Sequence, residues 1–207
     1  MIAIIDYGLG NLRSIQYKLK RFQVESIITS DPSELDKAEK LILPGVGAFG
    51  KGMENIEKNG LREILDKKVL EDKTPILGIC LGMQLFTNRS EEGNVDGLGW
   101  IDGTTRKFDF ENGSELKIPH VGWNSVAIAN GNRFIQDIDD DSVFYFVHSY
   151  YVECNDETDV LADTNYGVDF VSILNKGNIY GTQFHLEKSR LLGVQMLANF
   201  CKDPEIC

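Results

Sequence analysis

The sequence has few residues of the kinds that bind metals or cross-link a chain. Its 207 residues include only three histidines and four cysteines, and the cysteines at positions 80, 154, 201 and 207 form no Cys-x-x-Cys pair. This spacing argues against a zinc site and against a disulfide framework. We therefore expect free thiols in a reducing cytoplasm, with no metal and no cofactor.

Long apolar runs and a basic surface are also missing. No run approaches the ~20 apolar residues of a membrane span. The first residues reach an acid at Asp6 without a basic segment, so we expect a first strand there and no signal peptide. Lys and Arg number 21 against 32 Asp and Glu, which gives a formal net charge of −11. An acidic chain without a basic patch is a poor nucleic-acid binder, so neither nucleic acid nor membrane is an expected partner.

The pattern that remains is that of an α/β protein. The length predicts one domain, residues 1–207, large enough for a real core. Strand-like apolar runs alternate with helical segments in the first half, which predicts a flavodoxin-like, mostly parallel sheet with helices on both faces. The expected strands are residues 2–5, 24–29, 40–43 and 76–79, and the expected helices are residues 12–22 and 51–69.

The second half has a different rhythm. From residue 98 onward strands follow one another with little helix between them, which predicts an antiparallel section added to the parallel sheet. The expected strands are residues 100–110, 116–129, 142–153, 168–174 and 178–184, and a helix over residues 189–201 follows them.

Cys80 lies in the run GICLG, where Gly78 and Gly82 stand two residues to either side of it. A buried strand that enters Gly-x-Cys-x-Gly and then a helix has the pattern of a nucleophile elbow with sulfur in place of oxygen. Glycines allow the close backbone approach that such a turn requires. The N–H groups of the following helix favour a thiolate. A buried, inert cysteine is the alternative interpretation.

A cysteine nucleophile needs a base, and His185 is the first candidate. His185 and Glu187 are two residues apart at the end of an expected strand, so both side chains can point to the same face. The carboxylate can then orient the imidazole, which completes a Cys-His-Glu triad. An exposed ion pair is the alternative for these two residues. His120 and His148 are not excluded as bases, although His148, at the end of an aromatic strand, fits a pocket wall or a packing position.

Three glycine-rich loops follow expected strands, at residues 7–11, 44–47 and 78–82. Ligands of open parallel sheets bind outside the carboxyl ends of the strands, so these loops could converge on one crevice. The amide of Leu81 and an amide of the loop 44–47 could stabilise a developing oxyanion. The partial motif GLGN at residues 8–11 lacks the third glycine of a dinucleotide fingerprint, so NAD is not expected.

Taken together, these motifs resemble the class I (triad) glutamine amidotransferases, and the match extends over essentially the whole chain. The runs PGVG, GICLGMQ and QFHLEKS at residues 44–47, 78–84 and 183–189 are characteristic of the class. Further runs are similar to the glutaminase subunits of imidazole glycerol phosphate synthases in histidine biosynthesis. They are DYGLGNL, SEEG, GLG, IPHVGWN and YFVHSY, which begin at residues 6, 90, 97, 118 and 145.

The resemblance implies hydrolysis of glutamine to glutamate and ammonia through a cysteine thioester. It implies that Cys80 attacks the amide, that His185 transfers protons and that Glu187 orients His185. It assigns the oxyanion hole to backbone of Val46, Gly47 and Leu81, and glutamine binding to Gln84, Glu92, Ser149 and Tyr150, the last two partly through backbone.

The resemblance also implies a partner. Family members form a heterodimer with a (β/α)8-barrel synthase subunit that receives the ammonia and makes imidazole glycerol phosphate and an aminoimidazole carboxamide ribonucleotide. Asn11, Trp123 and Lys188 lie in runs that the family places near this partner. Such subunits have almost no glutaminase activity alone and become active when the partner binds its nucleotide. A peptide flip in the loop 44–47 would be a natural switch, because it can make or remove an oxyanion donor.

The sequence departs from the family pattern in two places. Leu186 stands where the family usually has proline between the catalytic histidine and glutamate, and residues 189–194 differ from the usual run. A paralogue that supplies ammonia for amidination of a surface-polysaccharide sugar therefore stays open. A cysteine hydrolase or peptidase of the same fold, and a binding module with a decayed site, are the remaining alternatives.

Overall fold

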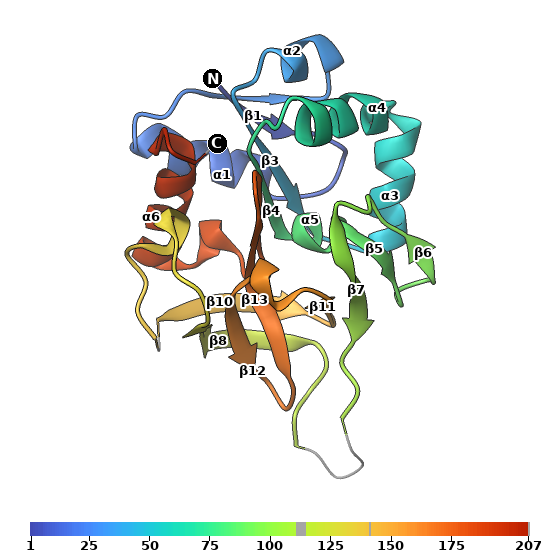
Figure 1. The fold of residues 1–207 in the computed structure, drawn as a ribbon, viewed down its shortest axis with the longest axis vertical. Coiled ribbons are helices and arrows are strands. Elements are labelled where there is room, and N and C mark those ends of the chain that lie inside the picture. The colour runs from blue at the N-terminus through green and yellow to red at the C-terminus, as the bar shows by residue number, and fades with distance from the viewer. Residues whose placement is uncertain (111–114, 141, 207) are drawn as a thin grey trace.

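The centre of the molecule is a parallel sheet (Figure 1). The computed structural model describes residues 1–110, 115–140 and 142–206. Hydrophobic strands lie in the parallel part because both of its faces are covered. Its strands, in spatial order, are β2 (Ser26–Thr29), β1 (Ile2–Ile5), β3 (Lys40–Gly45), β4 (Ile76–Cys80) and β14 (Ile179–Thr182).

Helices cover both faces of this sheet. All four side chains of β1 are buried although successive ones point to opposite faces, so both faces must be covered. Ile2 and Ile4 belong to the same core cluster as residues of α1 (Leu12–Arg21) and α6 (Arg190–Lys202). Ala3 and Ile5 belong to the opposite cluster, with residues of three other helices. Those helices are α2 (Pro32–Asp36), α3 (Phe49–Lys58) and α4 (Leu61–Asp66). The predicted α/β class with helices on both faces is confirmed.

The second half of the chain extends the sheet with mostly antiparallel strands. β14 is the junction, because it runs parallel to β4 on one side and antiparallel to β13 on the other. The remaining strands of the large sheet are β13 (Asp169–Lys176), β11 (Tyr150–Cys154), β7 (Ile101–Lys107), β5 (Thr87–Ser90), β6 (Val95–Asp96), β12 (Val160–Asn165) and β9 (Ala127–Ile128). β8 (His120–Ser125) and β10 (Val143–His148) form a separate antiparallel pair. The predicted antiparallel section is confirmed.

Several predicted boundaries were wrong. The single helix expected over residues 51–69 is interrupted at Gly60, which has a left-handed φ of +65°, and its end is a π-helical turn over Lys67–Glu71. The strand expected over residues 142–153 is two strands, β10 and β11, which belong to different sheets. The strand expected over residues 116–129 is likewise divided into β8 and β9.

Short elements complete the fold. They are α5 (Leu81–Gln84) and the 3-10 turns η2 (Arg133–Ile135), η3 (Glu157–Asp159) and η4 (Leu186–Lys188). The helix expected after Cys80 is therefore a single turn, so its macrodipole is small. Across the described ranges, no helix combines the length and the apolar character that a bilayer-spanning segment needs.

Candidate active site

Cys80 ends β4 with a strained backbone conformation. Its φ is +55° and its ψ is −110°, which a residue other than glycine adopts only when the surrounding structure holds it there. The flanking glycines make the turn possible. A Cβ at Gly82 would lie 1.8 Å from the carbonyl oxygen of Leu43, and one at Gly78 would lie 2.6 Å from the amide nitrogen of Met83. The chain thus forms the strand-turn-helix elbow that the spacing predicts, with its sulfur at the end of the sheet.

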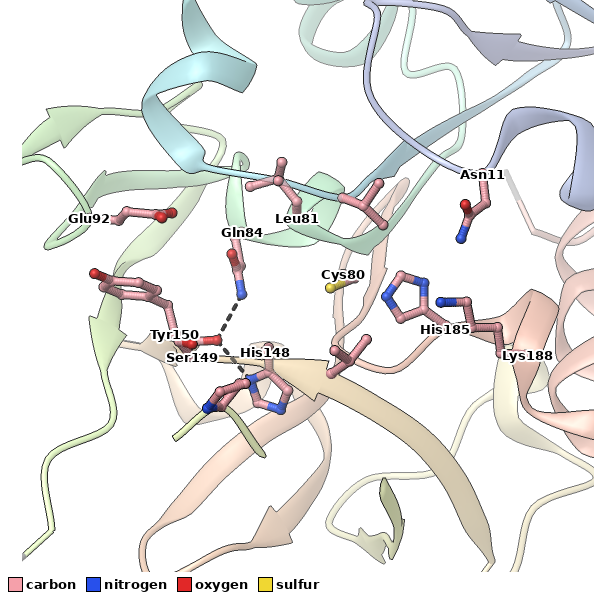
Figure 2. Close-up of a pocket in the computed structure, with 14 residues that line it drawn as sticks. Asn11, Cys80, Leu81, Gln84, Glu92, His148, Ser149, Tyr150, His185 and Lys188 are labelled. Carbon is pink, nitrogen blue, oxygen red and sulfur yellow. Dashed lines mark hydrogen bonds between the residues drawn. The ribbon is translucent and has the colours of Figure 1, made fainter. Parts of the chain in front are cut away.

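His185 lies beside Cys80 (Figure 2) and is itself held by Glu187. The Nδ1 atom of His185 is 3.0 Å from Oε1 of Glu187, and both side chains are buried. Burial lowers the pKa of His185, but the neighbouring Cys80 sulfur and the Glu187 carboxylate outweigh burial, so its pKa is raised. Nε2 of His185 has no hydrogen-bond partner among the described groups. This nitrogen is therefore available for proton exchange with the sulfur.

Glu187 is positioned by a second group from the other end of the chain. Asn11 precedes α1, but its side chain makes no capping hydrogen bond. Instead its Nδ2 donates to Oε1 of Glu187 at 2.9 Å. Burial raises the pKa of Glu187, while His185 and Asn11 lower it, and the net result is a lowered pKa. Glu187 is thereby kept as the carboxylate that orients His185.

These side chains open into one pocket of about 530 Å³. The three glycine-rich loops meet at it, as their positions after strands predict, and contribute Asn11, Val46 and Cys80. The other candidate residues in its lining are Gly47, Leu81, Gln84, Glu92, Ser149, Tyr150, His185 and Lys188. The structure thus brings together every predicted catalytic, oxyanion and glutamine-binding residue except Glu187, which lies behind His185.

The candidate glutamine-binding residues are partly engaged with the protein itself. Gln84 donates from Nε2 to the carbonyl oxygen of Tyr150 at 2.8 Å (Figure 2), and a carboxylate oxygen of Glu92 accepts the backbone amide of Phe49 at 2.7 Å. The carbonyl oxygen of Ser149 accepts the amide of Phe108. The Ser149 carbonyl therefore keeps one lone pair for a ligand, whereas the Tyr150 carbonyl accepts a second bond, from Nδ1 of His148 at 2.8 Å.

Trp123, a candidate interface residue, lies outside the pocket. It is on β8, 42% exposed, and lines a separate hollow with His120, Asn124 and Tyr166. The guanidinium of Arg190 lies 4.5 Å from the centre of the Trp123 ring, a cation–π contact. The other two candidates, Asn11 and Lys188, are in the pocket lining.

Sequence reasoning missed two buried polar groups beside the sulfur. Gln183 donates from Nε2 to Sγ of Cys80 at 3.7 Å, and the hydroxyl of Tyr7 is buried with no hydrogen-bond partner among the described groups. Burial and the charge of Cys80 both raise the pKa of Tyr7. The alternation used for His185 and Glu187 could have found Gln183, because it lies two residues before His185 on the same side. No comparable signal marks Tyr7.

The chemistry available in this pocket is that of a nucleophilic thiol with a base. Among the residues that the structure describes, no group of three or more His, Cys, Asp or Glu side chains is arranged to hold a metal ion. Cys154 and Cys201 are free, and burial raises the pKa of each to about 12. Neither of these thiols has a base arranged as His185 is arranged next to Cys80.

The geometry defines a protein with a Cys-His-Glu triad on a flavodoxin-like sheet, and comparison with known proteins agrees. Residues 3–203 match the family described as glutamine amidotransferase class-I, and the chain belongs to that family. A solved structure described as a glutamine amidotransferase has the same fold, with a TM-score of 0.73 and 16% identity over 97% of this chain and 98% of its own.

Relatives with much higher identity are known. The chain is 52% identical to imidazole glycerol phosphate synthase subunit HisH 2 of Methanococcus maripaludis, over 98% of this chain and 99% of that protein. It is 49% identical to subunit HisH 1 of Campylobacter jejuni, over 98% of this chain and 100% of that protein. The resemblance seen in the sequence is confirmed at the level of both the class and this subfamily.

Proposed function

We propose that this chain is the glutaminase subunit of an imidazole glycerol phosphate synthase and hydrolyses glutamine to glutamate and ammonia. The observation that carries the proposal is the buried triad. His185 is held through Nδ1 by Glu187, while its free Nε2 faces the sulfur of an elbow cysteine. The near full-length identity to HisH subunits supports the same activity. The match over residues 3–203 supports a single amidotransferase domain.

The reaction follows from these groups. Sγ of Cys80 attacks the side-chain carbonyl carbon of glutamine, and the proton that the sulfur gives up is held on Nε2 of His185, whose pKa is raised. The carbonyl oxygen becomes an oxyanion beside the amides of Leu81 and of the loop that contains Val46 and Gly47. His185 then protonates the departing nitrogen, ammonia leaves, and a thioester remains. Water adds to the thioester with His185 as base, the carbon–sulfur bond breaks, and glutamate is released with Cys80 regenerated.

Glutamine would lie in the pocket with its amide at Cys80 and its amino-acid end toward Gln84, Glu92, Ser149 and Tyr150. Nε2 of Gln84 is already used by the protein, so Oε1 is the atom of this side chain left for a ligand donor. The second carboxylate oxygen of Glu92 is a further acceptor that suits an ammonium group.

The partner is a (β/α)8-barrel synthase subunit in a heterodimer. Exposed apolar side chains near the pocket support a docking surface on this side, because such groups gather at protein interfaces. They include Val121 and Trp123 on β8 and Leu191 at the start of α6. Asn11 and Lys188 at the pocket complete the proposed interface. Free thiols are kept reduced in the cytoplasm, so the free cysteines at positions 80, 154 and 201 support a cytoplasmic location.

A second acceptor for the ammonia stays open, namely amidination of a surface-polysaccharide sugar by a related barrel protein. The relatives from Methanococcus maripaludis and Campylobacter jejuni carry copy numbers in their names, HisH 2 and HisH 1. A numbered copy is free to serve a second acceptor. Of the divergent residues 189–194, Leu191 is 73% exposed and belongs to the proposed interface. The glutaminase chemistry is the same in both cases.

The test is glutamate release from glutamine in the complex with the partner subunit and its nucleotide. Cys80→Ala removes the sulfur, so we expect release to fall to background. Cys154→Ala is the matched control, because it removes a thiol outside the pocket and should leave the rate unchanged. Near-wild-type release by the Cys80→Ala variant would overturn the proposed mechanism.

A further inference from the structure

Two buried histidines have no part in the proposed reaction, yet they contact one another. Nδ1 of His120 is 3.1 Å from Nε2 of His148, and Nδ1 of His148 is 2.8 Å from the carbonyl oxygen of Tyr150. Nδ2 of Asn124 is 3.4 Å from Nε2 of His120. Four groups are thus linked in a row, from the hollow beside Trp123 to the glutamine pocket.

The Tyr150 carbonyl and the neutral state of the two rings determine which ring nitrogens of His120 and His148 carry a hydrogen. A carbonyl oxygen can only accept, so Nδ1 of His148 carries a hydrogen. Burial lowers the pKa of His148 to about 3 and that of His120 to about 4, so both rings are neutral at pH 7. Nε2 of a neutral His148 is therefore an acceptor, and Nδ1 of His120 must donate to it. Nε2 of His120 is then an acceptor for Asn124.

The orientation of Asn124 agrees with this direction. Its Oδ1 accepts the amide of Ser125 at 2.9 Å, and its Nδ2 donates to the carbonyl oxygen of Asn165 at 3.0 Å. The amide therefore points its nitrogen toward His120. All hydrogen bonds run one way, from Asn124 through His120 and His148 to the Tyr150 carbonyl. We call these three side chains the relay.

The relay ends where a second hydrogen-bond chain begins. The Tyr150 carbonyl also accepts Nε2 of Gln84, and the two bonds converge on one oxygen (Figure 2). The other hydrogen of Gln84 goes to Oε1 of Gln183 at 3.0 Å, and Gln183 donates to Sγ of Cys80 at 3.7 Å. Both lone pairs of the Tyr150 carbonyl are occupied, so its orientation and that of Gln84 depend on each other.

We propose that Asn124, His120 and His148 are positioning residues for glutamine hydrolysis, because the relay fixes the Tyr150 carbonyl and, through Gln84 and Gln183, the surroundings of the Cys80 sulfur. This inference rests on the proposed glutaminase function. If the hydrogen bond from Nδ1 of His120 is lost, no donor faces Nε2 of His148. The His148 ring can then carry its hydrogen on Nε2 instead of on Nδ1. The Tyr150 carbonyl then loses its donor for part of the time, and Gln84 moves with it. The pocket becomes less well formed, and the KM for glutamine rises.

Two substitutions at His120 separate hydrogen bonding from packing. The His120 ring is stacked between Phe146 and Tyr166, with ring centres 4.9 and 4.0 Å away. His120→Phe keeps a stacked ring and removes the hydrogen bonds. His120→Asn loses the ring but keeps a donor at the place of Nδ1. We expect about a tenfold higher KM for His120→Phe, the effect of one lost hydrogen bond, and a KM within about threefold of wild type for His120→Asn.

The control is Tyr166→Phe, which keeps the stacking partner and removes a hydroxyl whose bonds to described residues are with the Lys117 backbone, outside the relay. It should leave KM unchanged. A wild-type complex without glutaminase activity would contradict the proposed function itself. An active wild type in which His120→Phe has the lower KM of the two His120 variants would overturn the relay and leave the glutaminase function standing.

A second measurement needs no variant. Nitrogen-15 NMR of the histidine rings in the full-length chain at pH 7 should show two neutral rings protonated on Nδ1, assigned to His120 and His148. Protonation of either ring on Nε2 alone, or a charged ring at either position, would contradict the direction of the relay.

Discussion

Cys80 derives its chemistry from its position more than from its own side chain. A backbone at φ +55° turns the sulfur toward His185, and the tight turn leaves no room for side chains at Gly78 and Gly82. The other thiols of the described chain lack this setting. The cost of holding a residue in such a conformation is about 1–3 kcal/mol, and it persists only where the surrounding structure fixes the backbone.

The contrast between thiols gives a prediction about labelling. We expect 6-diazo-5-oxo-L-norleucine, a glutamine-like electrophile, to modify Cys80 and spare Cys154 and Cys201, whose pKa values burial raises to about 12. Cys207 lies outside the described residues and is expected to be spared as well. Peptide mapping by mass spectrometry reads the result. Equal labelling of all cysteines would count against an activated sulfur at position 80.

Leu186 offers a test of how the triad is held. His185 has an extended backbone, with φ −84° and ψ 104°, close to what a following proline requires, and Leu186 is the first residue of a 3-10 turn. Leu186→Pro should therefore keep kcat/KM within about threefold of wild type. It should reduce the free energy of unfolding by about 1–3 kcal/mol, because the buried leucine loses packing.

Leu186→Ala is the matched control for this substitution. It removes the same packing without restraining the backbone, so it separates the cavity from the restraint. A folded Leu186→Pro protein without activity would show that the leucine marks a different local backbone from that of the proline-containing family.

Much of the site could be predicted at this scale, because Cys80, His185 and Glu187 lie in local motifs with a defined geometry. The hydrogen bond from Asn11 to Glu187 could not be predicted. Asn11 and Glu187 are 176 residues apart, and no local pattern says which side chains meet across the sheet. The pairing of His120 with His148 depends on the register of β8 with β10, which no motif encodes.

At the scale of elements, the site depends on three strands that end together. β3 and β4 bring the loop 44–47 to the cysteine elbow, and β14 delivers Gln183 and His185 from the far end of the chain. β14 does this because it is parallel to β4, although the strand that pairs with it on its other side is antiparallel. The direction of β14 thus puts the base at the same edge as the nucleophile.

The elbow makes a sharp prediction about Gly82. A Cβ there would lie 1.8 Å from the Leu43 carbonyl oxygen, so Gly82→Ala must displace β3 or α5. We expect a loss of at least about 2 kcal/mol in the free energy of unfolding, measured in urea, and a loss of glutaminase activity. Gly131→Ala is the control, because nothing lies within 4 Å of its Cβ position. An unchanged Gly82→Ala protein would contradict the close approach of α5 to β3.

The sequence predicted these elements where the hydrophobic pattern was strong. β1 and the core of β4 were found because buried parallel strands form continuous apolar runs. β5, with the sequence TNRS, was missed because a strand of polar residues has no apolar pattern that marks it. The break at Gly60 was missed because the apolar periodicity of residues 51–69 continues across it.

At the scale of the whole molecule, the buried histidines couple folding to pH. His120 and His148 have lowered pKa values in the folded chain, so below about pH 6.5 the unfolded chain binds protons that the folded chain does not. This destabilises the protein as the pH falls. His185 acts in the opposite direction, because its pKa is raised and its proton is retained on folding. Two histidines outweigh one, so the net change on acidification is a loss of stability.

We expect the free energy of unfolding in urea to fall by about 1–2 kcal/mol between pH 7 and pH 5.5, a range above the titration of most carboxylates. The fall should be about 1 kcal/mol smaller in His120→Phe, which removes one of the two buried neutral rings. Stability that stays level or rises toward pH 5.5 in the wild type would contradict the neutral state of both histidines.

The central claim is that Cys80 releases ammonia from glutamine for use by a barrel partner. Glutamine labelled with nitrogen-15 in its side-chain amide tests it most directly, in the complex with the imidazole glycerol phosphate synthase barrel subunit and its nucleotide. We predict that the label enters imidazole glycerol phosphate, that Cys80→Ala abolishes this transfer, and that free ammonium salt still supports synthesis by the variant complex. Labelled product from the Cys80→Ala complex, or no labelled product from an active wild-type complex, would contradict the account.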